Sequence, residues 1–174
     1  MRARGKCSEK EFVHTAYASI EQDMPIESAG LLLYRKRREV EVFLIHMGGP
    51  IWASRDMAAW SIPKGVVSRN EEKLVAARRE FQEETGFTAD GNFLPLGTFR
   101  QNASKNLTVW AVEGDCDPAE LTSTLFSMVW PPKSGRLQQF PEADRGGWFD
   151  RRTALKKIVK GQRPVLEAFY GKMA

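Results

Sequence analysis

Histidine and cysteine are scarce in this sequence, which has two of each in 174 residues. With only His14 and His46 as imidazoles and no G-x-S-x-G elbow, a serine-triad hydrolase is disfavoured. Neither Cys7 nor Cys116 lies beside a candidate base, which argues against a cysteine nucleophile too. The two cysteines also lack metal-type spacing, so we interpret them as unlinked thiols in a reducing compartment.

Long apolar runs are missing as well. The longest stretches, residues 29–34 and 42–47, are far shorter than the ~20 residues that cross a bilayer. Residues 1–23 lack the continuous apolar core of a secretory signal. We therefore expect a cytoplasmic protein without a membrane partner. The Gly-Gly-Pro turn at residues 48–50 does not match the G-x-x-x-x-G-K-[ST] pattern, so a P-loop is absent.

The composition is that of one soluble globular domain, with 42% apolar and 28% charged residues. A chain of this length can build a proper hydrophobic core but has no room for a second catalytic domain. The formal net charge of +4 suits phosphorylated substrates. Such a small excess does not by itself indicate a nucleic-acid-binding protein.

Short β-type segments alternate with helical segments along the chain. We expect a loosely ordered N-terminal extension over residues 1–27 and one domain over residues 28–174. The central helix is expected to begin after an N-cap at Asn70 and to stop at Gly86. The pattern predicts strands at 29–34, 40–47, 60–64, 93–100, 107–112, 126–130 and 147–149, and terminal helices at 152–159 and 164–170. This order favours an α+β or α/β three-layer sandwich.

The central helix carries an unusual acidic cluster near its C-terminal end. Glu80 and Glu84 are i, i+4 neighbours and Glu83 lies three positions from Glu80, so the three carboxylates share a narrow arc. Each such like-charge pair costs an isolated helix roughly 0.2–0.5 kcal/mol, and the helix dipole also disfavours negative charge there. Only Arg79 offsets this repulsion locally. A divalent cation would reverse it, because hard oxygen ligands are what Mg²⁺ or Mn²⁺ requires.

The same segment carries a family resemblance. Residues 65–87 read GVVSRNEEKLVAARREFQEETGF and resemble a complete Nudix box, with every fixed position of that pattern met. The resemblance runs from about residue 28 to about residue 169. It implies a Nudix-type α/β/α sandwich with a mixed central β-sheet.

The resemblance also implies roles for the box residues. It makes Glu80, Glu83 and Glu84 ligands of Mg²⁺ (or Mn²⁺), with one of them or a nearby acid taking the proton of the attacking water. Arg79 would orient a carboxylate by ion pairing, and Glu71 would join that network at the start of the helix. Two glycines have physical roles of their own: Gly65 would let the loop pass close to the metal site, and Gly86 would end the helix with a positive φ.

Outside the box, Trp60-x-x-Pro63-Lys64-Gly65 resembles the entry seen in Nudix members that act on dinucleoside polyphosphates, RNA 5′ ends or diphosphoinositol phosphates. Lys64 is then a phosphate contact or, alternatively, a solvent-facing lysine. Trp60 could stack on a base or belong to the core. Arg100 and Lys105 are weaker candidates for phosphate contacts.

Glu142 is the candidate for a further catalytic acid. Several Nudix members carry a carboxylate in the loop before a late Trp-containing strand, and Glu142 precedes Trp148 in this way. A surface glutamate is the alternative, and Asp144 or Glu120 could substitute.

The combination of SAGLLLYR, WSIPKG and FPEADRGGWF resembles a bacterial group of predicted nucleotide pyrophosphohydrolases. The resemblance implies a divalent-metal-dependent hydrolase that cleaves a phosphoanhydride bond in nucleoside diphosphate-X substrates, such as nucleoside triphosphates or dinucleoside polyphosphates. The alternative is a non-catalytic module that binds a nucleotide or an RNA 5′ end as a regulator. The intact set of acids speaks against that alternative. The oligomeric state cannot be read from the sequence.

Overall fold

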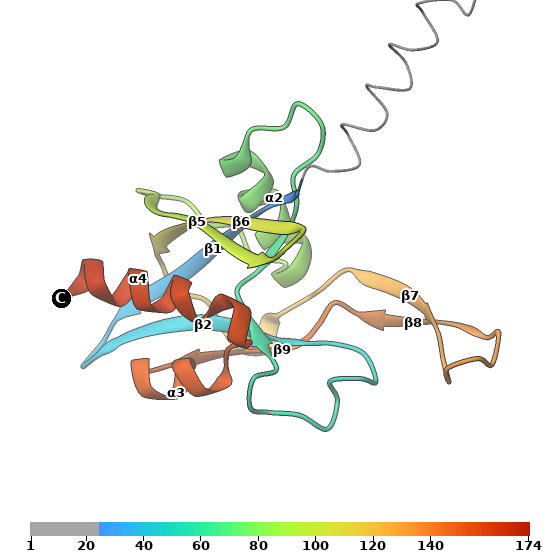
Figure 1. Cartoon of the computed structure of the whole chain (residues 1–174). Coiled ribbons are helices and arrows are strands. Elements are labelled where there is room, and N and C mark those ends of the chain that lie inside the picture. The colour runs from blue at the N-terminus through green and yellow to red at the C-terminus, as the bar shows by residue number, and fades with distance from the viewer. Residues whose placement is uncertain (1–24) are drawn as a thin grey trace, which may run out of the picture.

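The computed structural model describes residues 25–174 (Figure 1). Residues 1–24 of the predicted extension lie outside this range. The first strand already begins at Ile26, two residues before the predicted start of the domain. In the described part of the chain, no helix has the length and apolar character to span a lipid bilayer.

The described elements follow one another as strands with one early helix and two late helices. They are β1 (Ile26–Lys36), β2 (Val40–Met47), β3 (Trp60–Ser61), β4 (Lys64–Val66), α2 (Lys73–Thr85), β5 (Leu94–Asn102), β6 (Lys105–Glu113), η1 (Pro118–Glu120), β7 (Leu125–Val129), β8 (Leu137–Pro141), β9 (Ala143–Phe149), α3 (Arg151–Lys157), η2 (Lys160–Gln162) and α4 (Arg163–Met173).

Seven of the described strands form one mixed sheet. The main order is β3-β2-β1-β6-β5, with β4 paired to β1 and β9 paired to β2. The β1–β6 pair is parallel, and the other pairs of this sheet are antiparallel. Strands β7 and β8 form a separate antiparallel hairpin that projects from the body (Figure 1). The mixed sheet with its helices confirms the predicted fold class.

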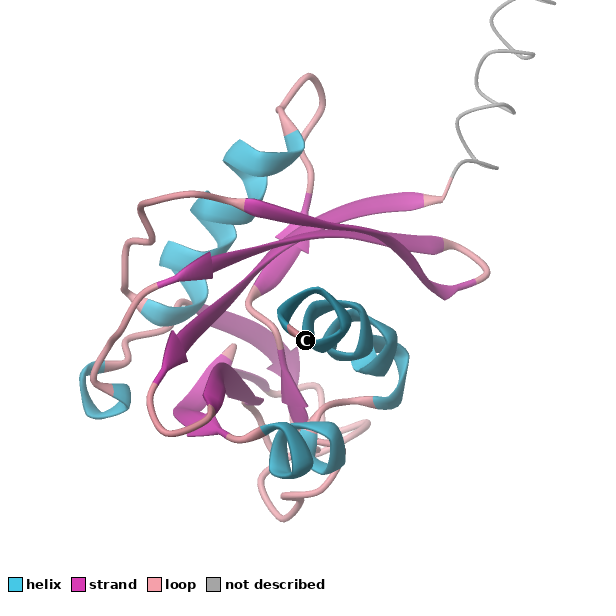
Figure 2. Ribbon diagram, turned by 90° about the vertical axis from the view of Figure 1, so that its left-hand side faces the viewer, coloured by secondary structure: helices cyan, strands magenta, loops and turns pink. Residues whose placement is uncertain are grey.

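Helices cover both faces of the sheet (Figure 2). Because side chains alternate along a strand, Leu31 of β1 packs in the cluster that contains Phe81 of α2. Its neighbour Leu32 points the other way, into the cluster that contains Phe169 of α4. Each of these side chains is fully buried. The sheet is therefore the middle layer between α2 and the C-terminal helices.

Two local predictions were wrong in detail. The strand predicted at residues 60–64 is divided into β3 and β4, and Pro63, which has no N–H to donate, lies in the break. Asn70 does not cap α2, because it adopts a positive φ of 64° in the preceding loop and the N-cap residue is Glu72. The predicted helix stop is confirmed: Gly86 has a φ of 78° and donates its N–H to the Gln82 carbonyl.

Candidate active site

Arg79 binds three of the predicted site glutamates together. Its Nε and Nη2 donate to the two carboxylate oxygens of Glu71 at 2.9 and 3.0 Å. Its Nη1 donates to Glu80 at 2.7 Å and to Glu83 at 3.2 Å. Nη2 also donates to the Val66 carbonyl at 3.1 Å, which ties α2 to the end of β4. The expected ion pairing of Arg79 with the box carboxylates is therefore present.

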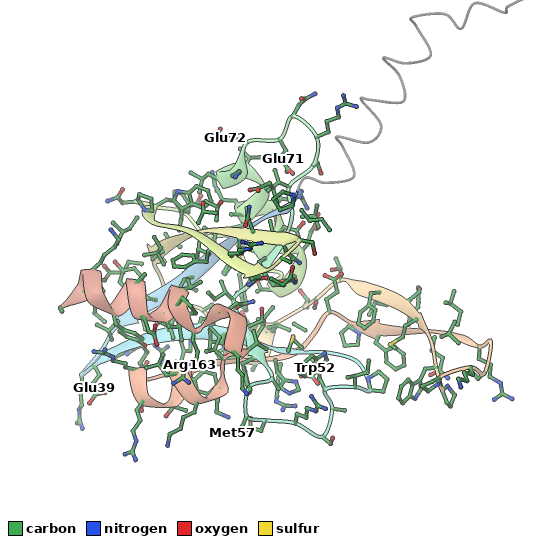
Figure 3. The ribbon with its side chains drawn as sticks, in the orientation of Figure 1. Glu39, Trp52, Met57, Glu71, Glu72 and Arg163 are labelled. Carbon is green, nitrogen blue, oxygen red and sulfur yellow. The ribbon has the colours of Figure 1, made fainter. Side chains whose placement is uncertain are left out.

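The hydrogen bonds between Arg79 and Glu71 stabilise the charged form of both side chains. Hydrogen bonds from Arg79 and from the Ser68 backbone lower the pKa of Glu71 to about 2, which keeps this carboxylate ionised. Hydrogen bonding to Glu71 raises the pKa of Arg79. Figure 3 shows Glu71 beside Glu72, just before α2 begins. From this loop the Glu71 carboxylate accepts the hydrogen bonds of the Arg79 guanidinium. Glu71 is thus a fixed partner of Arg79.

Glu80 lies directly against the backbone of Gly65. A β-carbon built on Gly65 would come within 1.9 Å of Glu80 Cδ and Oε2. Only glycine allows this approach, which is the close passage that the sequence predicted. The Glu80 side chain is 13% exposed. Burial raises its pKa despite the hydrogen bond from Arg79, and the charges of Glu83 and Glu142 act in the same direction.

Glu84 is the most buried carboxylate of the cluster, at 9% exposure. Its Oε2 accepts the backbone N–H of Lys64 at 2.8 Å. Burial raises its pKa to about 7, and the negative charges of Glu142 and Glu80 contribute to that rise, whereas Lys64 opposes it. A cation bound at these oxygens would relieve the unfavourable charge.

Glu142 is held beside the acidic helix by Thr124, which sequence reasoning did not single out. The Thr124 N–H donates to the Glu83 carbonyl at 2.9 Å, near the end of α2. The Thr124 carbonyl accepts the N–H of Glu142 at 2.9 Å, and its hydroxyl donates to the Glu142 carboxylate at 3.1 Å. No sequence signal links residues this far apart in the chain.

Two of the predicted phosphate-binding residues lie at the cluster. Lys64 and Lys105 are both half-buried, and each is close enough to Glu84 to affect its charge state or to be affected by it. Burial lowers the pKa of Lys105, and the nearby charge of Lys64 lowers it further. Arg100 instead donates to the carbonyls of Asn102 and Ala103 in its own hairpin, so its phosphate contact stays a prediction.

Of the two alternatives considered for Trp60, the structure supports the position in the core. Trp60 is 4% exposed, and its indole packs edge-on against Phe149 at 4.8 Å between ring centroids. Its Nε1 donates to Asp56 at 3.1 Å. Lys157 lies over its ring at 5.2 Å.

The donor set fits a hard divalent cation in chemistry and charge. Glu80, Glu83 and Glu84 offer carboxylate oxygens from consecutive turns of α2, and the first and last are sheltered from water. Among residues 25–174, no three His, Cys, Asp or Glu side chains converge closely enough to coordinate one ion as they stand. Arg79 instead binds two of the three carboxylates.

Known proteins resemble this chain in both sequence and fold. An 8-oxo-(d)GTP phosphatase of Mycolicibacterium smegmatis is 32% identical over 155 residues, which cover 80% of this chain and 42% of that protein. An RNA pyrophosphohydrolase of Caulobacter vibrioides is 41% identical over 58 residues, or 30% of this chain and 34% of that protein. The matches thus span less than half the length of these curated relatives.

Solved structures show the same fold at low sequence identity. An Ap4A hydrolase binary complex of C. elegans superposes with a TM-score of 0.59 at 22% identity, covering 84% of this chain and 97% of that one. The NUDIX domain of Shewanella oneidensis NrtR, complexed with ADP ribose, gives a TM-score of 0.58 at 14% identity, covering 97% of this chain and 100% of that one. The family model of the NUDIX domain matches residues 24–169. This chain therefore belongs to the NUDIX domain family.

Proposed function

We propose that this protein is a divalent-metal-dependent hydrolase that cleaves a phosphoanhydride bond in nucleoside diphosphate-X substrates. The observation that carries the proposal is the group of carboxylates on α2, of which Arg79 binds two and of which Glu84 lies near two half-buried lysines. The carboxylates can act as ligands for a cation, and the positively charged lysines can bind a phosphate chain in the same region. Nucleoside triphosphates and dinucleoside polyphosphates are the small substrates that match it.

In this proposal the basic and the acidic residues of the site have different roles. Lys64 and Lys105 bind the anionic phosphates, because a lysine ammonium acts as a point charge toward phosphate oxygens. Glu80, Glu83 and Glu84 would hold Mg²⁺ (or Mn²⁺), which would supply positive charge to stabilise the phosphate chain and would activate the attacking water. Arg79 keeps the glutamates oriented.

Glu142 is the proposed acceptor for the proton of the attacking water. Its carboxylate is close enough to raise the pKa values of Glu80 and Glu84. The Thr124 hydroxyl fixes one of its oxygens at 3.1 Å. The other oxygen can then accept a proton without the carboxylate turning away.

The names of the relatives support a nucleotide substrate. One curated relative is named for 8-oxo-(d)GTP and another for RNA. We extend these substrate classes to this chain only as candidates, together with the 5′ end of RNA. A cytoplasmic location is part of the same proposal.

The test is phosphate or nucleotide release from a panel with Mg²⁺ and with Mn²⁺. The panel contains canonical and oxidised nucleoside triphosphates, diadenosine polyphosphates, ADP-ribose and 5′-triphosphorylated RNA. Glu83→Gln and Glu84→Gln are expected to lose turnover while their circular dichroism spectra stay native. Glu167→Gln, an exposed change on α4, is the matched control. Unimpaired turnover in both α2 variants would refute the proposal, and saturable binding without turnover by the wild type would favour a non-catalytic module.

A further inference from the structure

His46 is the one histidine within residues 25–174, and the proposed mechanism gives it no role. Its side chain is fully buried near the end of β2. Both ring nitrogens lie 2.7 Å from an oxygen: Nδ1 from the Asp144 carboxylate and Nε2 from the Arg55 carbonyl. Because a carbonyl oxygen only accepts, Nε2 donates to Arg55, and Nδ1 bonds the carboxylate through a second proton. The imidazole thus joins the loop after β2 to the start of β9.

Asp144 is the extra residue of a β-bulge in β9. His46 pairs with Arg145, and the next residue of β2, Met47, pairs with Ala143, so Asp144 has no partner within the described ladder. A bulge changes the direction in which nearby side chains point, and a slip of one residue turns each side chain to the other face of a sheet. The contact with His46 therefore holds the point in β9 at which the register shifts.

Glu142 lies two residues before Asp144 and contacts the same end of β2. The Gly48 N–H donates to the Glu142 carbonyl at 2.8 Å. A β-carbon built on Gly48 would come within 1.9 Å of the Pro141 carbonyl oxygen, so the two backbones are in direct contact. Thr124 binds Glu142 separately, through its carbonyl and its hydroxyl. The position of Glu142 thus depends on the end of β2 as well as on Thr124.

The Asp144 carboxylate has one other charged neighbour among the described residues. This is Arg145, whose Nη1 lies 3.5 Å from the same carboxylate oxygen. The Arg145 side chain is 47% exposed, whereas that of His46 is 0% exposed. An exposed ion pair contributes little to stability, but a buried donor that loses its acceptor is costly. Removal of the Asp144 carboxylate should therefore act mainly through His46.

We propose that His46 is a positioning residue for Glu142. By bonding both Asp144 and the Arg55 carbonyl, its imidazole holds the bulge in register, and the bulge keeps the Glu142 carboxylate directed at the acidic residues of α2. The inference rests on the proposed function, in which Glu142 accepts the proton of the attacking water. Asp144, which the sequence left open as an alternative to Glu142, then supports the bulge and is not the proton acceptor.

The kinetic test compares two changes at Asp144. Asp144→Asn keeps a polar side chain of the same shape that can bond Nδ1 of His46, whereas Asp144→Leu leaves this nitrogen without its partner. Asp144→Leu should lower kcat by about tenfold. Its KM should change little, because Lys64 and Lys105 are untouched. Asp144→Asn should recover most of the rate.

Amide hydrogen exchange tests the same contact without turnover. The N–H groups of Gly48 and Glu142 are both hydrogen-bonded in the wild type, to the carbonyls of Glu142 and Thr124. In Asp144→Leu these two amides should exchange about tenfold faster, because the segment opens more often. In Asp144→Asn they should exchange at close to the wild-type rate.

A change at His46 completes the comparison. His46→Phe keeps a ring in the core but has no nitrogen, so it should lower kcat as Asp144→Leu does. The double variant His46→Phe/Asp144→Leu should lose little more than the larger single loss, because both changes break the same contact. The two Asp144 variants decide the test by themselves if His46→Phe does not fold.

Asp90→Leu is the matched control, because it removes an exposed carboxylate that pairs with Arg78. It should keep the wild-type kcat and the wild-type exchange rates. The inference would be overturned by wild-type kcat in Asp144→Leu, by additive losses in the double variant, or by equal losses in both Asp144 variants, which would make Asp144 itself the acid. Failure of the proposed function is distinct, since the wild type would then turn over no panel substrate, while the exchange rates would still report on the contact.

Discussion

The carboxylate of Glu80 occupies the space in which a β-carbon of residue 65 would lie, because a methyl group on Gly65 would fall 1.9 Å from Glu80 Cδ. The Nudix pattern of this chain thus includes a steric requirement. Residue 65 of β4 must lack a side chain, because the Glu80 carboxylate of α2 lies in that space. Changes at Gly65 should affect activity through Glu80.

Gly65→Ala is expected to displace the Glu80 carboxylate and to lower kcat/KM by about a hundredfold, the typical cost of a misplacement of about 1 Å. The fold should survive, because the clash is with the far end of a flexible side chain. Steady-state kinetics and thermal unfolding measure the two effects. Gly171→Ala is the control: no atom lies within 4 Å of its added β-carbon, and helix propensity predicts about 0.5–1 kcal/mol of added stability. Wild-type kinetics in Gly65→Ala would contradict this account.

Arg79→Lys should lower kcat/KM by about tenfold or more, because a lysine cannot reproduce a two-pronged contact with one carboxylate while binding a second. In the wild type the guanidinium donates to both oxygens of Glu71 and to Glu80. Arg78→Lys is the matched control, since Arg78 is exposed and pairs only with Asp90 among the described carboxylates. Equal kinetics in the two variants would show that Arg79 supplies charge alone.

Thr124→Val removes the hydroxyl that holds Glu142 but keeps the backbone hydrogen bonds of residue 124. If the hydrogen bond at 3.1 Å positions the acid, kcat should fall by about tenfold, corresponding to about 1.4 kcal/mol. Thr124→Ser keeps a hydroxyl and should recover most of the rate. Identical rates in Thr124→Val and Thr124→Ser would remove Glu142 from the proposed mechanism.

Gln162→Leu should destabilise the fold by about 1–3 kcal/mol, because the buried N–H of Ile62 would lose its acceptor. Urea unfolding gives the free energy of unfolding directly. The comparison variant is Gln138→Leu, whose exposed side chain donates to the Trp130 carbonyl and whose loss should cost little. A stable Gln162→Leu protein would mean that η2 is held by other contacts.

The predictions that succeeded from sequence concern neighbours on one helix or one turn. The spacing of Glu80, Glu83 and Glu84 already determines that they share one side of α2, and Arg79 could be assigned to them because it is adjacent. Gly86 was predictable as a helix stop because its left-handed conformation is a local property. By the same local reasoning Asn70 was predicted to cap the helix. The loop after β4 instead extends past Asn70, and the helix begins at Lys73.

The residues that sequence reasoning left open or did not single out depend on contacts between distant segments. Trp60 could be read either as a base-stacking ring or as core, and only its packing against Phe149 decided between these. Thr124 and Gln162 carry no motif, and their importance appears only because they form hydrogen bonds with residues far away in the sequence.

The sequence alone therefore determined which acidic side chains lie together on α2 and where the helix ends, since helical periodicity and glycine conformations act over a few residues. The tertiary structure decided which other groups lie near that helix: Glu142 through Thr124, and Lys105 through the pairing of β6 with β1. The physical reason is that a buried polar group must find a partner wherever the packed core leaves one, and that location is set by the whole fold.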